Sequence, residues 1–277
     1  MVVQHNMQAM NANRQLGVTT ESQKKVTEKL SSGYKVNRAA DDAAGLTISE
    51  KMRSQIRGLT QASSTAQDGI SCVQTAEGAL TEVHSMLQRM NELAVKAANG
   101  TNTTADRQAI QKEVTALTTE ISRVAQSTQF NTLNLLSGSV FGNGVKLQVG
   151  AANETAQQIT ITISKMDASA LGIGGANAVN VTTQGNAQEA IGKITKAIAK
   201  VSAQRSDLGA VQNRLEHTIA NLDNVVENTT AAESQIRDTD MAKTMVEYTK
   251  NNILSQAGTA MLAQANQSTQ NVLSLLS

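Results

Sequence analysis

Few residues of this 277-residue chain have the types and spacing that catalysis or metal binding requires. The three histidines, His5, His84 and His217, lie far apart, and the chain contains no His-Glu-x-x-His motif of the kind that holds zinc in peptidases. The adjacent acids Asp41 and Asp42 have no histidine beside them and stand where a helix is expected to begin. Carboxylates in that place accept free backbone N–H groups and face the positive end of the helix dipole. We interpret the pair as a helix cap and predict no metal site.

The remaining reactive groups also indicate structural roles. A single cysteine, Cys72, excludes an internal disulfide, and its apolar neighbours Ile70 and Val73 predict a buried thiol. The glycines at 172–175 do not complete a G-x-G-x-x-G motif and do not follow a buried strand, so they do not predict a phosphate-binding loop. Because no nucleophile is paired with a base, the sequence predicts no enzyme activity and no cofactor.

Composition excludes further classes of function. The 24 basic and 23 acidic residues leave a net charge of +1, which gives no electrostatic case for nucleic acid or an anionic membrane as a partner. No apolar run approaches the roughly 18 residues of a membrane-spanning helix, so no membrane insertion is predicted. Residues 1–16 contain no basic stretch followed by an apolar one, and so do not resemble a cleavable secretory signal. If the chain leaves its cell, we expect a route that reads no such signal.

Regular apolar spacing organises the chain into helix-length segments. Proline, which interrupts helices at a cost of about 3 kcal/mol, is absent, and only two phenylalanines, two tyrosines and no tryptophan occur. Any core must therefore consist of aliphatic side chains and methionine. Two segments carry an apolar residue at nearly every seventh position, which is the spacing of helices that pack against one another along their length. The two columns are Met52, Leu59, Ala66, Val73, Leu80, Leu87 and Ala94, and Ile194, Val201, Leu208, Leu215, Leu222, Thr229 and Ile236.

Between the two columns the pattern changes. The alternation of β-branched residues at 146–149 and 159–163 predicts a β-hairpin. The predicted helices span residues 1–32, 43–98, a stretch from the turn at 99–102 to about 126, 187–232 and 240–276. Because helices at both ends enclose the β segment, we expect the N- and C-terminal segments to run side by side. The predicted fold is mainly α, a long antiparallel helical bundle of coiled-coil rods with a small β-hairpin in the middle.

The C-terminal segment predicts assembly. No charged side chain lies between Asn251 and Ser277, where uncharged amides share the helix with small apolar residues. The alternative is an ordinary amphipathic helix folded onto its own chain, but such a helix normally turns charged residues toward solvent. We therefore predict that one broad apolar side is buried in a polymer. Its residues are Ile253, Leu254, Ala257, Ala260, Met261, Ala265, Val272, Leu275 and Leu276.

Several strings match one family in order and position. The string LSSGYKVNRAADDAAGLTISEKM at 30–52, with those at 58–71 and 74–101, resembles the N-terminal region of bacterial flagellins. The strings STQFNTLNLLSG at 127–138, RSDLGAVQNRLEH at 205–217 and QAGTAMLAQANQSTQNVLSLLS at 256–277 resemble the rest. The chain is similar to a short flagellin that lacks the large variable outer domains.

The resemblance implies a two-layer subunit of the bacterial flagellar filament, a helical homopolymer that serves motility. The implied segments are 1–42 as inner-core helix and spoke, 43–170 as outer rod helices with the hairpin, 171–186 as a short loop replacing the variable domains, 187–235 as the C-terminal rod helix, and 236–277 as the inner-core C-terminal helix. It also implies a secreted protein, exported unfolded through the flagellar type III apparatus. The implied partners are an export chaperone that holds about 235–277, a filament cap and a hook–filament junction protein.

The resemblance further implies recognition by the animal Toll-like receptor 5 through the outer rod. We call the implied residues the recognition patch, and they would double as axial contacts between subunits. The recognition patch consists of Leu87, Gln88, Arg89, Leu93, Glu113, Ile194 and Ile198. Arg89 is the leading functional candidate because its guanidinium offers five donors in a fixed fork, whereas Lys96 departs from the family pattern.

Two alternatives compete with a filament subunit. A hook–filament junction protein shares the terminal helices but forms only a short collar, and the intact VLSLLS ending together with the DDAAG string favours a flagellin. A secreted helical effector, such as a translocator, would need an apolar membrane-inserting segment, which the sequence lacks. The sequence therefore favours the filament subunit.

Overall fold

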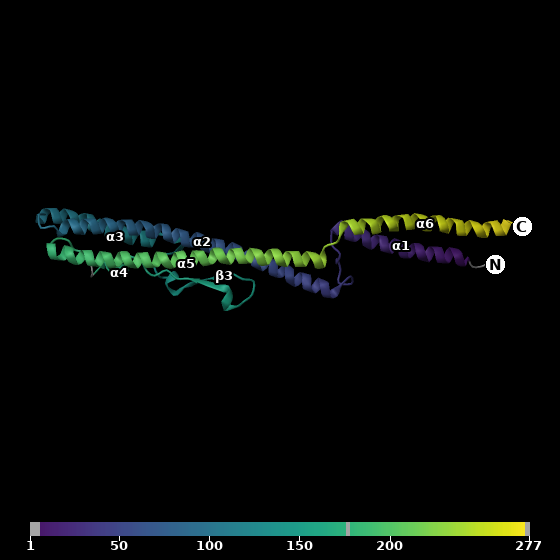
Figure 1. The fold of residues 1–277 in the computed structure, drawn as a ribbon, viewed down its shortest axis with the longest axis horizontal. Coiled ribbons are helices and arrows are strands. Elements are labelled where there is room, and N and C mark those ends of the chain that lie inside the picture. The colour runs from purple at the N-terminus through teal and green to yellow at the C-terminus, as the bar shows by residue number, and fades with distance from the viewer. Residues whose placement is uncertain (1–5, 176–177, 275–277) are drawn as a thin grey trace. The chain divides into compact units, whose positions relative to one another are not determined.

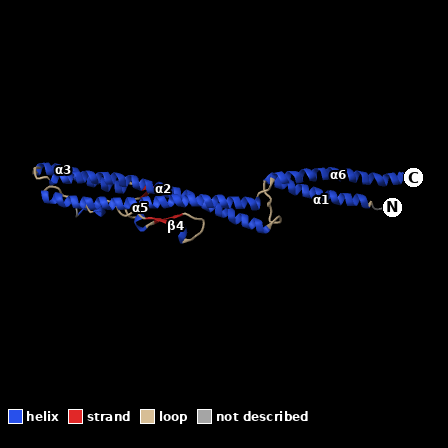
Figure 2. Ribbon diagram, viewed as in Figure 1, coloured by secondary structure: helices blue, strands red, loops and turns tan. Residues whose placement is uncertain are grey.

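The computed structural model describes residues 6–175 and 178–274, with side chains described as far as residue 268. Helices make up most of the chain, and the short strands lie in its middle (Figure 2). The α-helices are α1 (Met7–Ser32), α2 (Ala43–Ala98), α3 (Thr104–Ser127), α4 (Ala168–Leu171), α5 (Gln184–Arg237) and α6 (Met241–Ser274). Two 3-10 turns, η1 (Phe141–Asn143) and η2 (Thr155–Gln157), accompany strands β1 (Gln129–Phe130), β2 (Leu133–Asn134), β3 (Val145–Gln148) and β4 (Gln158–Ile161). The predicted fold class is confirmed.

The chain divides into two compact units. Unit 1 comprises residues 1–56 and 227–277, and unit 2 comprises residues 57–226. The boundaries fall within α2 and α5, so each long helix contributes to both units. The five segments expected from the sequence concern layers of an assembled filament, which a single chain does not test, and they stay a prediction.

The core of unit 2 lies where α2, α3 and α5 run side by side (Figure 1). Within both seven-residue columns, every seventh residue from Leu59 to Ala94 and from Ile194 to Leu222 is buried, as predicted, whereas the outer members Met52, Thr229 and Ile236 are half-buried. Leu59 packs with Leu222, and Ala66 with Leu215, so α2 and α5 are antiparallel. The columns therefore form an apolar seam that consists of one large buried cluster followed by two small ones. The third helix adds Ile110, Val114, Ile121 and Ala125 to it.

Polar caps define the turn from α2 to α3. The Arg107 guanidinium donates to the carbonyls of Ala97 at 2.9 Å and Asn99 at 3.0 Å, which satisfies carbonyls left free at the end of α2. Thr103 and Asp106 form a reciprocal capping box at the start of α3. The hydrogen bond from the Thr103 hydroxyl lowers the pKa of Asp106, so this cap is charged at neutral pH.

The predicted β-hairpin is present and docks on the α2–α5 seam. Strands β3 and β4 pair antiparallel with Leu147 opposite Ile159, one or two residues from the predicted bounds. Val149 and Ile159 pack against Ala66 and Leu215. The close approach depends on Gly69 of α2, since a Cβ there would overlap Leu147 Cδ1.

Two glutamine side chains fasten extended segments onto the helices. The buried Gln204 of α5 accepts from Ser164 N at 3.1 Å and donates to Thr162 O at 3.1 Å. Gln111 of α3 accepts from Val181 N at 2.7 Å and donates to Val179 O at 3.0 Å. Each amide satisfies a backbone donor and acceptor, as a neighbouring strand would.

Some local structure differs from the sequence expectations. Asp42 caps α2 as predicted, accepting from Gly45 N at 2.9 Å, but Asp41 does not cap that helix. Its carboxylate instead accepts from Asn37 N and Arg38 N, and these backbone donors lower its pKa. Helix α5 begins before residue 187 because Thr183 Oγ1 accepts from Asn186 N at 3.3 Å. The sequence also gave no sign of the β1–β2 turn.

In unit 1, α1 and α6 lie side by side (Figure 1). Helix α1 ends at Ser32 and is capped by Gly33, which has φ 75° and donates to Lys29 O at 2.9 Å, as the sequence predicted. Asn251 Nδ2 donates to Ser22 Oγ at 3.1 Å across the pair. Gly258 permits close approach, because a Cβ there would lie 3.1 Å from Leu16 Cδ1.

A junction centred on Arg237 ties the end of α5 to the start of α2 within unit 1. Its guanidinium lies 4.7 Å from the Tyr34 ring centroid and pairs with Glu50 Oε1 at 2.7 Å. Its carbonyl accepts from Lys35 N at 2.6 Å, and Tyr34 forms an isolated antiparallel bridge with Asp238. The hydrogen bond from Arg237 lowers the pKa of Glu50. We call this group the Arg237 junction.

We predict that Gly69→Ala destabilises unit 2 by about 1 kcal/mol, because overpacking against Leu147 costs about 1–3 kcal/mol and exceeds the helix-propensity gain of about 0.5–1 kcal/mol. Denaturant unfolding measures the change. The matched control is Gly78→Ala on the same helix, which meets nothing within 4 Å and should stabilise. In a Leu147→Ala background, Gly69→Ala should also stabilise. If Gly69→Ala behaves like Gly78→Ala in the native background, the hairpin does not approach α2 as described.

We predict that Arg237→Lys loosens the segment 33–42, because lysine keeps the charge but loses the planar stacking on Tyr34 and the fork that reaches Glu50. Amide exchange in that segment should quicken. Since the folded-state pKa of Glu50 is lowered, the carboxylate stabilises the junction fully above its ordinary pKa of 4.5, and this stabilisation is lost as pH falls through the lowered value. Glu50→Gln should remove this acid dependence, and an unchanged pH profile in that variant would contradict the role of the ion pair.

Candidate assembly and recognition surfaces

The described residues contain no group of three or more His, Cys, Asp or Glu side chains arranged to hold a metal ion. None of the helices, over the described part of the chain, is both long and apolar enough to cross a membrane. Cys72 is buried, as predicted, and desolvation raises the pKa of its thiol. The features that bear on function are therefore two exposed surfaces, one on each unit.

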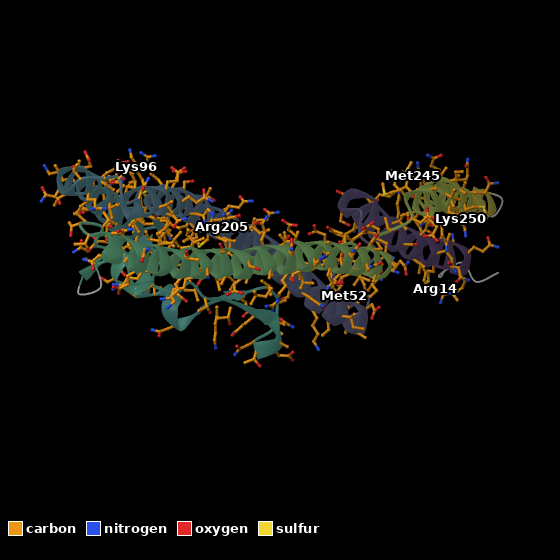
Figure 3. The ribbon with its side chains drawn as sticks, turned by 60° about the vertical axis from the view of Figure 1, so that its left-hand side comes forward. Arg14, Met52, Lys96, Arg205, Met245 and Lys250 are labelled. Carbon is orange, nitrogen blue, oxygen red and sulfur yellow. The ribbon has the colours of Figure 1, made fainter. Side chains whose placement is uncertain are left out.

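The helix pair α1 and α6 carries most of the exposed apolar side chains. Over the described residues, thirteen large apolar side chains are exposed, and nine of them lie on these two helices. Met245 projects outward from α6 (Figure 3). We call the nine residues the α1/α6 surface. They are Met7, Met10, Val18, Met241, Met245, Val246, Ile253, Leu254 and Met261.

A groove of about 870 Å³ runs between α1 and α6. Apolar side chains of Leu16, Leu254 and Met261 line it together with amides such as Gln15 and Gln264. Along the part of α6 with described side chains, only Thr244 and Ala265 are buried. A helix so little buried by its own chain retains an apolar side that another molecule can cover.

Most of the predicted polymerisation residues lie in this exposed region. Ile253, Leu254, Ala257, Ala260 and Met261 are exposed, whereas Ala265 is buried within the helix pair. Val272 lies in α6 beyond the described side chains, and Leu275 and Leu276 lie outside the described residues. The resemblance implied that residues 1–42 belong to the inner core, but the predicted polymerisation residues included none of α1, whose Met7, Met10 and Val18 do not continue as a heptad column.

A second surface is polar and centres on Arg89. Its guanidinium pairs with Glu113 Oε1 of α3 at 2.9 Å and with Glu92 Oε2 of α2 at 3.2 Å. The hydrogen bond to Glu113 contributes most to raising the pKa of Arg89. The three side chains border a cavity of about 580 Å³ that Lys96 and Asn102 also line. The site can therefore offer an oriented guanidinium and two carboxylates to a partner.

The structure separates the recognition patch into two kinds of residue. Gln88, Arg89 and Glu113 are exposed, and Ile198 is half-buried. The buried members are Leu87, Leu93 and Ile194, which belong to the core of unit 2. They can support a recognition surface only from beneath. Glu92 was absent from the predicted patch, although its position three residues after Arg89 on a helix is a signal for an ion pair.

Comparison with known proteins decides the family. Residues 3–140 match the model of the bacterial flagellin N-terminal helical region, and residues 191–276 match that of the C-terminal helical region. A flagellin of Halalkalibacterium halodurans is 56% identical over 276 residues, with both chains fully covered. The chain belongs to the bacterial flagellin family.

A second flagellin supports the same family assignment. The flagellin of Bacillus subtilis is 52% identical over 305 residues, again with 100% of both chains covered. The crystal structure of Bacillus cereus flagellin is 31% identical, with 56% of this chain and 86% of that chain matched at a TM-score of 0.49. The two family models and the full-length similarity to the Halalkalibacterium halodurans and Bacillus subtilis flagellins confirm the resemblance inferred from the sequence, including the short form. As a flagellin, the chain is a structural subunit of the flagellar filament outside the cell and not an enzyme.

Proposed function

We propose that this flagellin polymerises through its α1/α6 surface, which becomes the inner layer of the filament, and that unit 2 forms the outer rod. The observation that carries the proposal is the concentration of nine exposed large apolar side chains on one helix pair. Burying apolar surface is worth about 25 cal/mol per Å², so a repeated contact along these helices supplies a driving force for assembly. The uncharged amides around the groove suit contact between like copies, because they bring no like-charge repulsion.

We also propose that the chain is exported unfolded through the flagellar type III apparatus. A single cysteine leaves no internal disulfide to reduce before unfolding, and the absence of proline removes slow isomerisation from refolding outside. The thin core of the α1/α6 pair unfolds at little cost. An export chaperone that covers about 235–277 would keep the apolar residues of α6 from associating in the cytoplasm. The filament cap and the hook–filament junction protein would meet the same terminal helices at the two ends of the polymer.

We propose, further, that Toll-like receptor 5 contacts unit 2 at the exposed part of the recognition patch. Gln88, Arg89 and Glu113 supply donors and acceptors on adjacent turns of α2 and α3. Their ion pairs hold Arg89 in one orientation before a partner arrives, which lowers the entropy cost of binding. The same residues would make axial contacts between subunits in the filament.

For polymerisation, we predict that Leu254→Gln raises the critical concentration of seeded assembly by at least about tenfold, because it places a polar amide in a surface that assembly buries. Sedimentation of polymer from a dilution series measures it. The matched control is Val140→Gln in unit 2, since Val140 is similarly exposed, at 38% against 45% for Leu254. Equal critical concentrations for the wild type and Leu254→Gln would contradict the proposed surface.

For recognition, we predict that Arg89→Ala weakens receptor binding by the monomer and lowers the temperature at which filaments depolymerise, with unchanged circular dichroism of the monomer. The reason is the loss of a preoriented guanidinium, a side chain common among binding hot spots. Arg123→Ala is the control, because Arg123 makes a comparable exposed ion pair, with Glu120 of α3. If both variants leave binding and depolymerisation unchanged, Arg89 is an ordinary surface charge.

A further inference from the structure

Among the residues that the structure describes, exposed methionines occur only on the helix pair proposed to polymerise. The chain has ten methionines, nine of them in the described residues. Met52 and Met86 are half-buried, and Met90 and Met166 are buried. The other five are exposed by 49–66% of their surface and all belong to α1 or α6. These five, which we call the exposed methionines, are Met7, Met10, Met241, Met245 and Met261.

We propose that the exposed methionines form an oxidative modification site, at which a hydroperoxide such as hydrogen peroxide converts thioethers to sulfoxides in the unassembled chain and thereby blocks polymerisation. The inference rests on the proposed burial of the α1/α6 surface in the filament. The proposal identifies the subunit with oxidised methionines as a chemical state that does not polymerise.

The chemistry needs only the side chain and the oxidant. The thioether sulfur attacks one peroxide oxygen, an S–O bond forms, and the O–O bond breaks. The other oxygen leaves with both bonding electrons, takes up the proton released from the transferred oxygen, and departs as water. Sulfur is oxidised by two electrons and the peroxide is reduced by two. Attack requires access to the sulfur, which the exposed methionines provide before assembly.

The product is incompatible with a dry helix contact. Methionine suits such a contact because its flexible apolar chain fills irregular gaps, and Met261 lines the groove between α1 and α6. A sulfoxide is polar and chiral, and burying it without a hydrogen-bond donor is costly. Spacings of three residues for Met7 and Met10, and four for Met241 and Met245, place each pair on one helix face. Oxidation therefore alters continuous stretches of the surface.

The buried core of unit 2 is protected from the same reaction, although Met86 of this unit is half-buried. Met90 and Met166 are 0% and 5% exposed, so its core methionines are shielded. Cys72 is 6% exposed, and burial raises the pKa of its thiol, so little of the more reactive thiolate forms. The modified chain consequently keeps its folded outer rod while losing the ability to assemble.

The test uses the full-length chain. Monomer is treated with hydrogen peroxide, the oxidant is removed with catalase, and seeded polymerisation is measured with peptide mass spectrometry of each methionine. We expect the critical concentration to rise roughly tenfold or more, with recovery after incubation with methionine sulfoxide reductases.

Assembled filaments given the same dose of peroxide should show much less sulfoxide at the exposed methionines. In a variant with leucine at all five positions, peroxide should leave the critical concentration at the untreated value of that same variant, because leucine has no thioether to oxidise. The matched control replaces Met52, Met86 and Met166 with leucine and should remain sensitive.

A second readout needs no variant. In a partly oxidised wild-type sample, chains that enter the polymer should be depleted of sulfoxide at the exposed methionines relative to chains left in solution. Equal sulfoxide content in the two fractions, or an unchanged critical concentration after oxidation, would overturn the inference while leaving the proposed polymerisation intact. Failure of the untreated chain to polymerise would instead contradict the proposed function itself.

Discussion

Two paired helices can bury only the side chains on the faces that they turn toward each other. This limit accounts for the difference in burial between the two units of the molecule. The α1 and α6 helices pack side by side, for example where Gly258 meets Leu16, but nine of their large apolar side chains remain exposed to water. Unit 2 buries its apolar side chains on more than one face of each helix, because α2, α3, α5 and the hairpin enclose a core between them. In the proposed assembly, unit 2 folds on its own and carries helices whose partners arrive only in the polymer.

The rod achieves its order with small, specific contacts in addition to apolar burial. Gly69 lets the hairpin approach α2, and Gln111 and Gln204 use side-chain amides to fasten extended segments that have no neighbouring strand. These contacts hold the segments on either side of residues 171–178 against α3 and α5. The outer surface of unit 2 is thus defined by helices and their fastened connections, and the Arg89 cluster lies on that fixed surface.

Much of this arrangement follows from local patterns in the sequence. Seven-residue spacing identified the buried columns from Leu59 to Ala94 and from Ile194 to Leu222, because an apolar position that recurs on one helix face must be covered. Contacts between distant segments had no such signal. The glutamine fastenings depend on residues 40 to 70 positions apart, and the β1–β2 turn uses Asn131 and Thr132 at positive φ without a glycine to mark it. The apolar column indicated a structural role for Leu87 and left Arg89 as the functional candidate, whereas Leu93 lies outside the column and its burial was not predicted.

The most direct test of this account is amide hydrogen exchange on the same chain as monomer and as filament. In the monomer, amides of α6 over residues 241–268 should exchange faster than those of α5 over residues 194–222, because opening free energy follows local burial. Polymerisation should slow exchange in α6 by roughly a hundredfold or more and change the buried stretch of α5 little. Equal protection of both stretches in the monomer, or no gain in α6 on polymerisation, would contradict the claim that these terminal helices complete their burial only in the filament.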